Sequence, residues 1–194
     1  FTIVDIESSG RANVLEYDNP STIILRGAEI LDPSWKKVPC IFTFVEFNLD
    51  PSWKKVTLDK GKNTGKVLKY CSFIPAKEDR IMFCSDGVAQ SGMGSEAFPF
   101  GWGRDEIASY ASSLVHSEAS ISAVMLSGKI VTMAHKNDSY KAKDDISCAT
   151  IYFRDPRKLL ICTGPPYEKE KDKELAVKVK DYKGKVILSG GTTA

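Results

Sequence analysis

The order of apolar runs along the chain restricts the fold more than any other feature of the sequence. Five short runs rich in β-branched and aromatic residues lie in the first 85 positions, at 1–6, 12–17, 22–26, 66–73 and 80–85. Helical periodicity follows over 104–115 and over about 117–135, and a strand-like run returns at 146–153. This order predicts an α+β fold built on a sheet sandwich and argues against a regular doubly wound sheet.

Turn and cap residues mark several boundaries of these elements. Ser8-Ser9-Gly10 separates the first two runs, which predicts a β-hairpin, and Asp18-Asn19-Pro20 predicts the next turn. Acidic residues open the segment 104–115, where they favour the positive end of a helix dipole. Ser117 is the candidate N-cap of the second helix.

A chain of 194 residues is expected to form one domain with at most a small appendage. We expect a main domain over 1–155 and a βαβ-like extension over 156–194, with strands at 158–164 and 185–191 around a Lys/Glu-rich helix at about 168–182. The extension ends in a Gly-rich turn where a helix would normally begin, and Phe1 lies inside a strand-like run. We therefore expect a piece of a longer chain.

An exact repeat interrupts the run of strands. LDPSWKKV occurs at 31–38 and again at 49–56, with the aromatic, strand-like CIFTFVEF at 40–47 between the copies. One exact copy does not indicate a solenoid, which needs at least three diverged units. Proline, paired lysines and nearby glycines predict a surface loop insertion over 31–64.

Charge and cysteine content exclude several classes of partner. The chain has 27 basic and 25 acidic residues, and this small surplus predicts neither a nucleic-acid nor a membrane partner. The sequence contains no run of about 20 apolar residues, which is the length that a membrane-spanning helix needs. The five cysteines include no CxxC pair and four lie in or beside apolar runs, which favours buried thiols and a cytoplasmic protein.

Two acidic sites lie at the ends of predicted strands. Asp86-Gly87 follows the run IMFC, and Asp144-Asp145 precedes ISCATIYF. Carboxylates at strand ends can project into a cleft, and hard divalent cations prefer such oxygen ligands. The same residues are also common in ordinary turns and caps, so spacing alone leaves both interpretations open.

The motifs around these sites resemble a phosphatase family. FCSDGV at 83–88 and DDISCATIYF at 144–153 are similar to the last two motifs of SpoIIE-like serine/threonine phosphatases, which belong to the metal-dependent type 2C (PPM) superfamily. The resemblance covers about 1–30 and 66–154 and implies a type 2C phosphatase-like β-sandwich flanked by helices. GPP at 164–166 and GGTTA at 190–194 resemble the C-terminal extension of a bacterial subgroup.

This resemblance implies a function and a ligand set. Asp86 and Asp144 would bind two Mn²⁺ or Mg²⁺ ions, with Gly87 and Asp145 near the site. A metal-bound water would hydrolyse phosphoserine or phosphothreonine on a protein partner in bacterial signalling. The family's first Asp-Gly motif, whose Asp bridges both ions, is expected upstream of Phe1. Residues 1–194 alone would then bind metal weakly, and the alternative is a non-catalytic regulatory or scaffold domain of the same fold.

Other candidate residues fit structural roles better. His116 and His135 lie at predicted helix ends, where a cap or surface role is favoured over catalysis. Cys84 lacks the arginine-containing phosphate loop of cysteine phosphatases and is expected in the core. The Gly-rich aromatic loop 98–103 would either shape substrate access or cover the sheet with Trp102. The GGTTA tail lacks both GxGxxG and GxxxxGK, which leaves a structural or partner-binding role.

Overall fold

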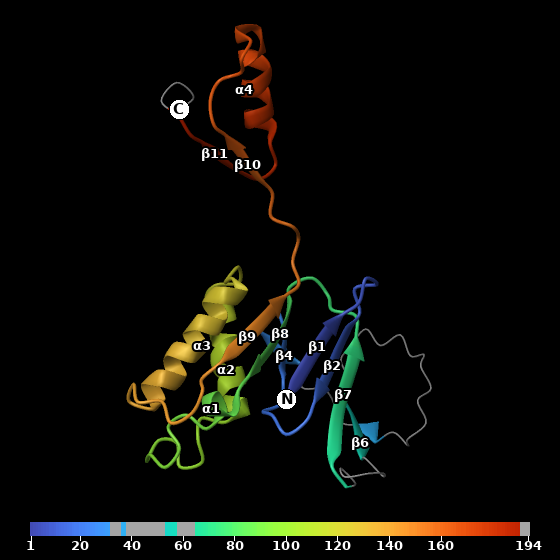
Figure 1. Ribbon diagram of the computed structural model, residues 1–194, viewed down its shortest axis with the longest axis vertical. Coiled ribbons are helices and arrows are strands. Elements are labelled where there is room, and N and C mark those ends of the chain that lie inside the picture. Colours follow the sequence, from blue (N-terminus) through green and yellow to red (C-terminus); the bar gives the residue numbers. More distant parts are fainter. Residues whose placement is uncertain (32–35, 38–52, 58–64, 191–194) are drawn as a thin grey trace. The chain divides into compact units, whose positions relative to one another are not determined.

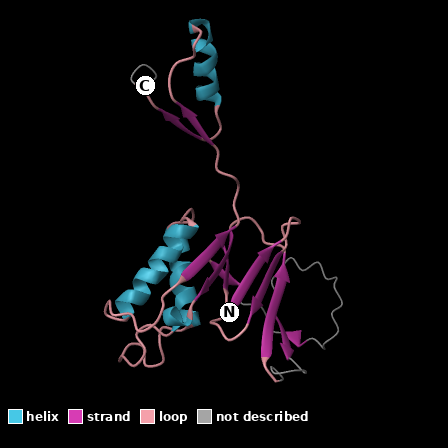
Figure 2. Cartoon of the chain, in the orientation of Figure 1, coloured by secondary structure: helices cyan, strands magenta, loops and turns pink. Residues whose placement is uncertain are grey.

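The computed structural model describes residues 1–31, 36–37, 53–57 and 65–190. These residues divide into two compact units, Phe1–Arg154 and Asp155–Ala194. The first unit contains two sheets and a layer of helices (Figures 1 and 2). None of the helices in the described part of the chain combines the length and hydropathy that a membrane crossing requires.

A five-stranded sheet forms one layer of the first unit, with the strand order β1-β2-β7-β6-β5. β1 (Thr2–Ile6) and β2 (Ala12–Glu16) form the predicted hairpin, and β2 pairs antiparallel with β7 (Val67–Phe73). Residues at alternate positions of β2 and β7 point into the sandwich, as a half-buried strand requires.

The repeat region contributes two strands to this sheet. β6 (Trp53–Thr57) pairs antiparallel with β7, and β5 (Lys36–Lys37) pairs parallel with β6, so that equivalent residues of the two repeat copies face each other. The expectation of a loop throughout 31–64 is therefore wrong for these two segments, because the pairing of β6 with β7 and of β5 with β6 outweighs the local turn composition. The expected strand at 40–47 lies outside the described residues.

A four-stranded antiparallel sheet forms the second layer, in the order β4-β3-β8-β9. Its strands are β3 (Ile23–Arg26), β4 (Glu29–Leu31), β8 (Asp79–Cys84) and β9 (Cys148–Tyr152). One face packs against the five-stranded sheet through a buried cluster of Ala12, Val14, Ile24, Cys71, Phe73 and Ile81. Both central strands, β3 and β8, bury side chains on both faces, which explains the apolar runs Ile23–Leu25 and Ile81–Cys84 within them.

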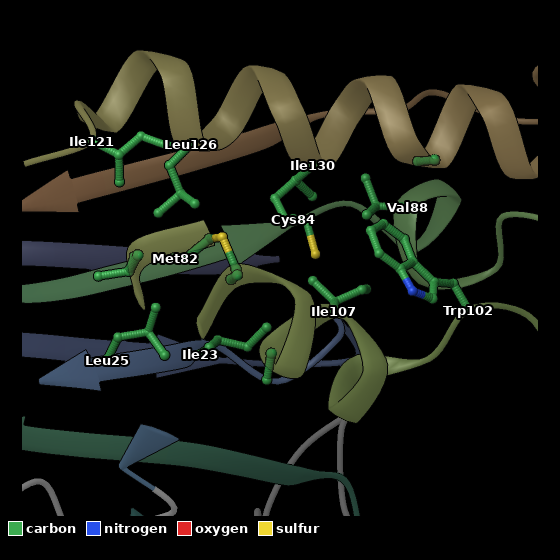
Figure 3. Close-up of a cluster of buried hydrophobic side chains, with 14 residues drawn as sticks. Ile23, Leu25, Met82, Cys84, Val88, Trp102, Ile107, Ile121, Leu126 and Ile130 are labelled. Carbon is green, nitrogen blue, oxygen red and sulfur yellow. The ribbon is translucent and has the colours of Figure 1, made fainter. Parts of the chain in front are cut away.

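Helices α2 (Arg104–Ser117) and α3 (Ala123–Asn137) cover the other face of this sheet. Figure 3 shows Ile121, Leu126 and Ile130 facing Met82 and Leu25 of the sheet, with Trp102 closing one end of the cluster. The N-cap of α3 is Ser122, which accepts a hydrogen bond from the Met125 amide. The predicted cap at Ser117 is wrong, because Ser117 is the last residue of α2.

The second unit is a small βαβ element. β10 (Leu159–Cys162) pairs parallel with β11 (Lys185–Leu188), and the 3₁₀ turn η2 (Lys169–Lys171) and helix α4 (Asp172–Asp181) connect them. Helix α4 buries none of its residues, and Cys162 is the one core residue within Asp155–Gly190. The last residues of the GGTTA motif lie outside the described part of the chain.

Candidate metal-binding site

The Asp86-Gly87 motif lies where the central strand β8 enters a short helix. Ser85 leaves β8 with an extended backbone, and α1 (Asp86–Ala89) begins at the next residue. The Asp86 carboxylate accepts a hydrogen bond of 3.2 Å from the Gly87 amide, and the side chain is exposed to solvent. Strand β8 therefore presents an exposed carboxylate at its end, and Asp86 itself is not among the residues that line the pocket described below.

Gly87 packs directly against the Asp144-Asp145 motif. A Cβ placed on Gly87 would lie 2.5 Å from the carbonyl oxygen of Asp145 and 3.4 Å from the carbonyl carbon of Asp144. Such contacts exclude every residue larger than glycine unless the backbone shifts. The two acidic motifs, far apart in the sequence, thus meet at one place in the fold.

Ser85 joins the same two segments by hydrogen bonds. Its hydroxyl donates to the Asp145 carbonyl oxygen at 2.6 Å and accepts from the Ser147 amide at 3.0 Å. Its own amide donates to the Ser147 carbonyl oxygen at 2.9 Å. These bonds extend the β8–β9 pairing to the residues that carry the carboxylates.

A small, partly open pocket of about 150 Å³ lies at this junction. It is lined by Gly87, Gln90, Met93, Asp138, Lys143 and Asp144. Asp144 is exposed, and one of its carboxylate oxygens accepts a hydrogen bond of 2.8 Å from the Asp145 amide. Asp138 and Lys143 line the pocket without any sequence motif to indicate it, because a lining position depends on tertiary packing.

Asp86 and Asp144 offer carboxylate oxygens, which are the ligand type that hard divalent cations prefer. Asp86 and Asp144 each use one oxygen on a neighbouring backbone amide, which leaves further lone pairs for a ligand. Mg²⁺ typically takes one or two carboxylates and keeps several waters. Within the described residues no group of three or more histidine, cysteine or acidic side chains is placed to hold a metal ion.

The cysteine and histidine candidates lie outside this pocket. Burial, with a smaller contribution from neighbouring Cys148, raises the pKa of the Cys84 thiol to about 12, so the thiol is protonated at neutral pH. Cys84 belongs to the cluster between sheet and helices, as expected. His116 and His135 lie in the last turns of α2 and α3, and neither lines the pocket.

The Gly-rich loop after α1 has one of the two roles that its sequence left open, which is to cover the core with Trp102. Trp102 is buried and its ring lies 5.7 Å from that of Tyr110, so it covers the core. Gly101 packs on the backbone of Ala89 and Gln90 at the rim of the pocket. The preceding Phe100 is 91% exposed.

Comparison with known proteins identifies the fold. No family model matches the sequence, and no curated protein matches it. The phosphatase domain of the cell fate determinant SpoIIE from Bacillus subtilis, in a manganese-presoaked structure, aligns over 81% of this chain and 57% of that domain, with 10% identity and a TM-score of 0.52. A second structure of that domain aligns over 81% and 60%, with 12% identity and a TM-score of 0.49.

The first of these alignments shows that the chain has the fold of a type 2C phosphatase-like sandwich. The chain spans somewhat more than half of the length of the SpoIIE phosphatase domain. The likeness extends to architecture alone, and the function must be argued from the site.

Proposed function

We propose that this chain is part of a metal-dependent phosphatase of the SpoIIE-like subgroup that hydrolyses phosphoserine or phosphothreonine on a protein partner. The contact of Gly87 with the Asp144-Asp145 backbone carries the proposal, because it brings the two acidic motifs together beside a pocket that Gly87 and Asp144 line. The shared fold supports it independently. GPP at 164–166 supports assignment to the subgroup with a C-terminal extension.

Asp86 and Asp144 would hold Mn²⁺ or Mg²⁺, and two ions are proposed for the full-length protein. Such ions, when bound, activate water and neutralise charge on a transferring phosphoryl group. The protein's own contribution is positioning: Ser85 fixes the two strand ends together, and Gly87 lets their backbones approach. A further carboxylate from upstream of residue 1 remains part of the proposal.

The proposal also covers the partner and the compartment. Phe100 and the partly open pocket suit a phosphorylated side chain on a protein surface, and the near balance of charge favours no nucleic-acid partner. Cys84, Cys148 and Cys162 are free thiols, which suits a cytoplasmic protein. The βαβ unit is proposed to bind a partner or to regulate the phosphatase unit.

Phosphate release by the full-length protein tests this proposal. We expect hydrolysis of an aryl phosphate and of a phosphoserine peptide that requires Mn²⁺ or Mg²⁺ and stops in excess chelator, with much less activity from residues 1–194 alone. Metal binding without hydrolysis of either substrate would favour the non-catalytic scaffold domain instead.

A further inference from the structure

Lys143 is the one cationic side chain among the described residues that line this pocket. Lys143 lines the pocket together with the carboxylates Asp138 and Asp144. Its ammonium group instead donates a 2.8 Å hydrogen bond to the backbone carbonyl oxygen of Met93. Within the described part of the chain it forms no ion pair with either carboxylate.

This hydrogen bond holds the Lys143 side chain across the pocket. Met93 also lines the pocket, on the loop after α1, so the hydrogen bond ties the lysine, which precedes Asp144 in the chain, to a second lining segment. A lysine ammonium has three N–H donors. One donor contacts Met93, which leaves two for a ligand.

The Met93 loop is itself fixed by the end of α3. The Gly92 amide donates to the Asp138 carboxylate at 2.8 Å, and the Asn137 amide group donates to the Ser91 hydroxyl at 3.3 Å. Asp138 therefore serves as an acceptor for the loop backbone. The carbonyl oxygen that receives Lys143 belongs to a loop with its own tertiary hydrogen bonds.

We propose that Lys143 binds a phosphoryl oxygen of the substrate and positions it beside Asp144. This inference rests on the proposed phosphatase function and names a substrate-binding residue for it. A phosphoryl group carries negative charge and is repelled by bare carboxylates, so the site needs cations on more than one side of it. Lysine is a common phosphate ligand that acts as a point charge with rotatable donors.

Kinetics of the full-length protein test the role of Lys143. Lys143→Gln is expected to raise the KM for p-nitrophenyl phosphate about tenfold with a smaller change in kcat, because one charge-assisted hydrogen bond is lost. Lys143→Arg retains the charge and should stay within about threefold of wild type. Lys141→Gln removes a nearby exposed lysine that does not line the pocket and should change neither constant.

Chemical labelling gives a second readout that does not depend on turnover. In the presence of Mn²⁺, inorganic phosphate should slow acetylation of Lys143 by acetic anhydride and leave Lys141 unaffected, as measured by mass spectrometry of the peptide that contains both. An unchanged KM for Lys143→Gln, or equal labelling of Lys143 with and without phosphate, would overturn the inference. If wild type hydrolyses nothing yet phosphate protects Lys143, the phosphatase proposal fails and the anion-binding role stands.

Discussion

At the scale of single residues, the two aspartates carry the proposed chemistry. Asp86→Ala and Asp144→Ala are each expected to lower metal-dependent phosphate release by about a hundredfold or more, since each removes a charged ligand from the ion. Asp145→Asn should be milder, because Asp145 contacts the site through its backbone. Full activity of either alanine variant at low metal concentration would contradict the assignment.

Gly87 is expected to be essential because of its contact with Asp145. Gly87→Ala places a methyl group 2.5 Å from a backbone oxygen, and the shift needed to relieve this should cost about 1–3 kcal/mol and reduce activity. Gly128→Ala in helix α3 is the matched control. Beyond its chain neighbours and the helix's own backbone, no described atom lies within 4 Å of the added methyl group, and alanine should stabilise the helix by up to about 1 kcal/mol. Urea unfolding of both variants measures the difference.

Cys84 is close to the site but is not expected to react. Its thiol is buried in the core and protonated at neutral pH, and the proposed nucleophile is water. Cys84→Ser should therefore retain most of the phosphatase activity. Loss of hydrolysis in Cys84→Ser with metal affinity intact would point to a cysteine-based mechanism.

At the scale of elements, the start of helix α3 allows a direct comparison of two serines. Ser122→Ala should lower the free energy of unfolding by about 1 kcal/mol, because the Met125 amide loses its acceptor. Ser117→Ala should stay within about 0.5 kcal/mol, since the exposed Ser117 hydroxyl only bonds back to the Ser113 carbonyl oxygen. Equal losses would contradict the observed cap.

The same helix shows why some boundaries escaped the sequence analysis. Ile121 is buried and fits the helical spacing of the apolar residues in α3, so the spacing predicted that the helix starts near Ser117. In the structure, residues 118–122 instead connect α2 to α3. The β1–β2 hairpin was predicted and found because its signal is local, with Ser8-Ser9-Gly10 between two β-rich runs. β6 has no such signal, because its pairing depends on a partner strand distant in the sequence.

The candidate site, like the fold, could be predicted from the sequence only where the signal is local. Asp86-Gly87 and Asp144 carry a recognisable family pattern, and the structure places both motifs at one junction. Lys143 and Asp138 carry no pattern of their own. Their position at the pocket arises from the packing of the segment between α3 and β9 against α1 and the loop after it, which depends on the fold.

At the scale of the whole molecule, the two units are expected to separate under limited proteolysis. Residues 153–158 between them belong to no helix or strand, and Arg154 and Arg157 are exposed. An arginine-specific protease should cut there first and leave a stable fragment of the first unit, detected by mass spectrometry. Arg80 is buried and serves as the internal control. Early cleavage at Arg80 would contradict the described core.

The central claim is that Asp86 and Asp144 bind the same divalent ion site across the β8–β9 junction. Isothermal titration of Mn²⁺ into full-length wild type, Asp86→Asn, Asp144→Asn and the double variant tests it most directly. We expect each single variant to bind Mn²⁺ about tenfold or more weakly, with the double variant losing less than the sum of the two free-energy changes, because shared ligands are not additive. Unchanged Mn²⁺ affinity in both single variants would contradict the account.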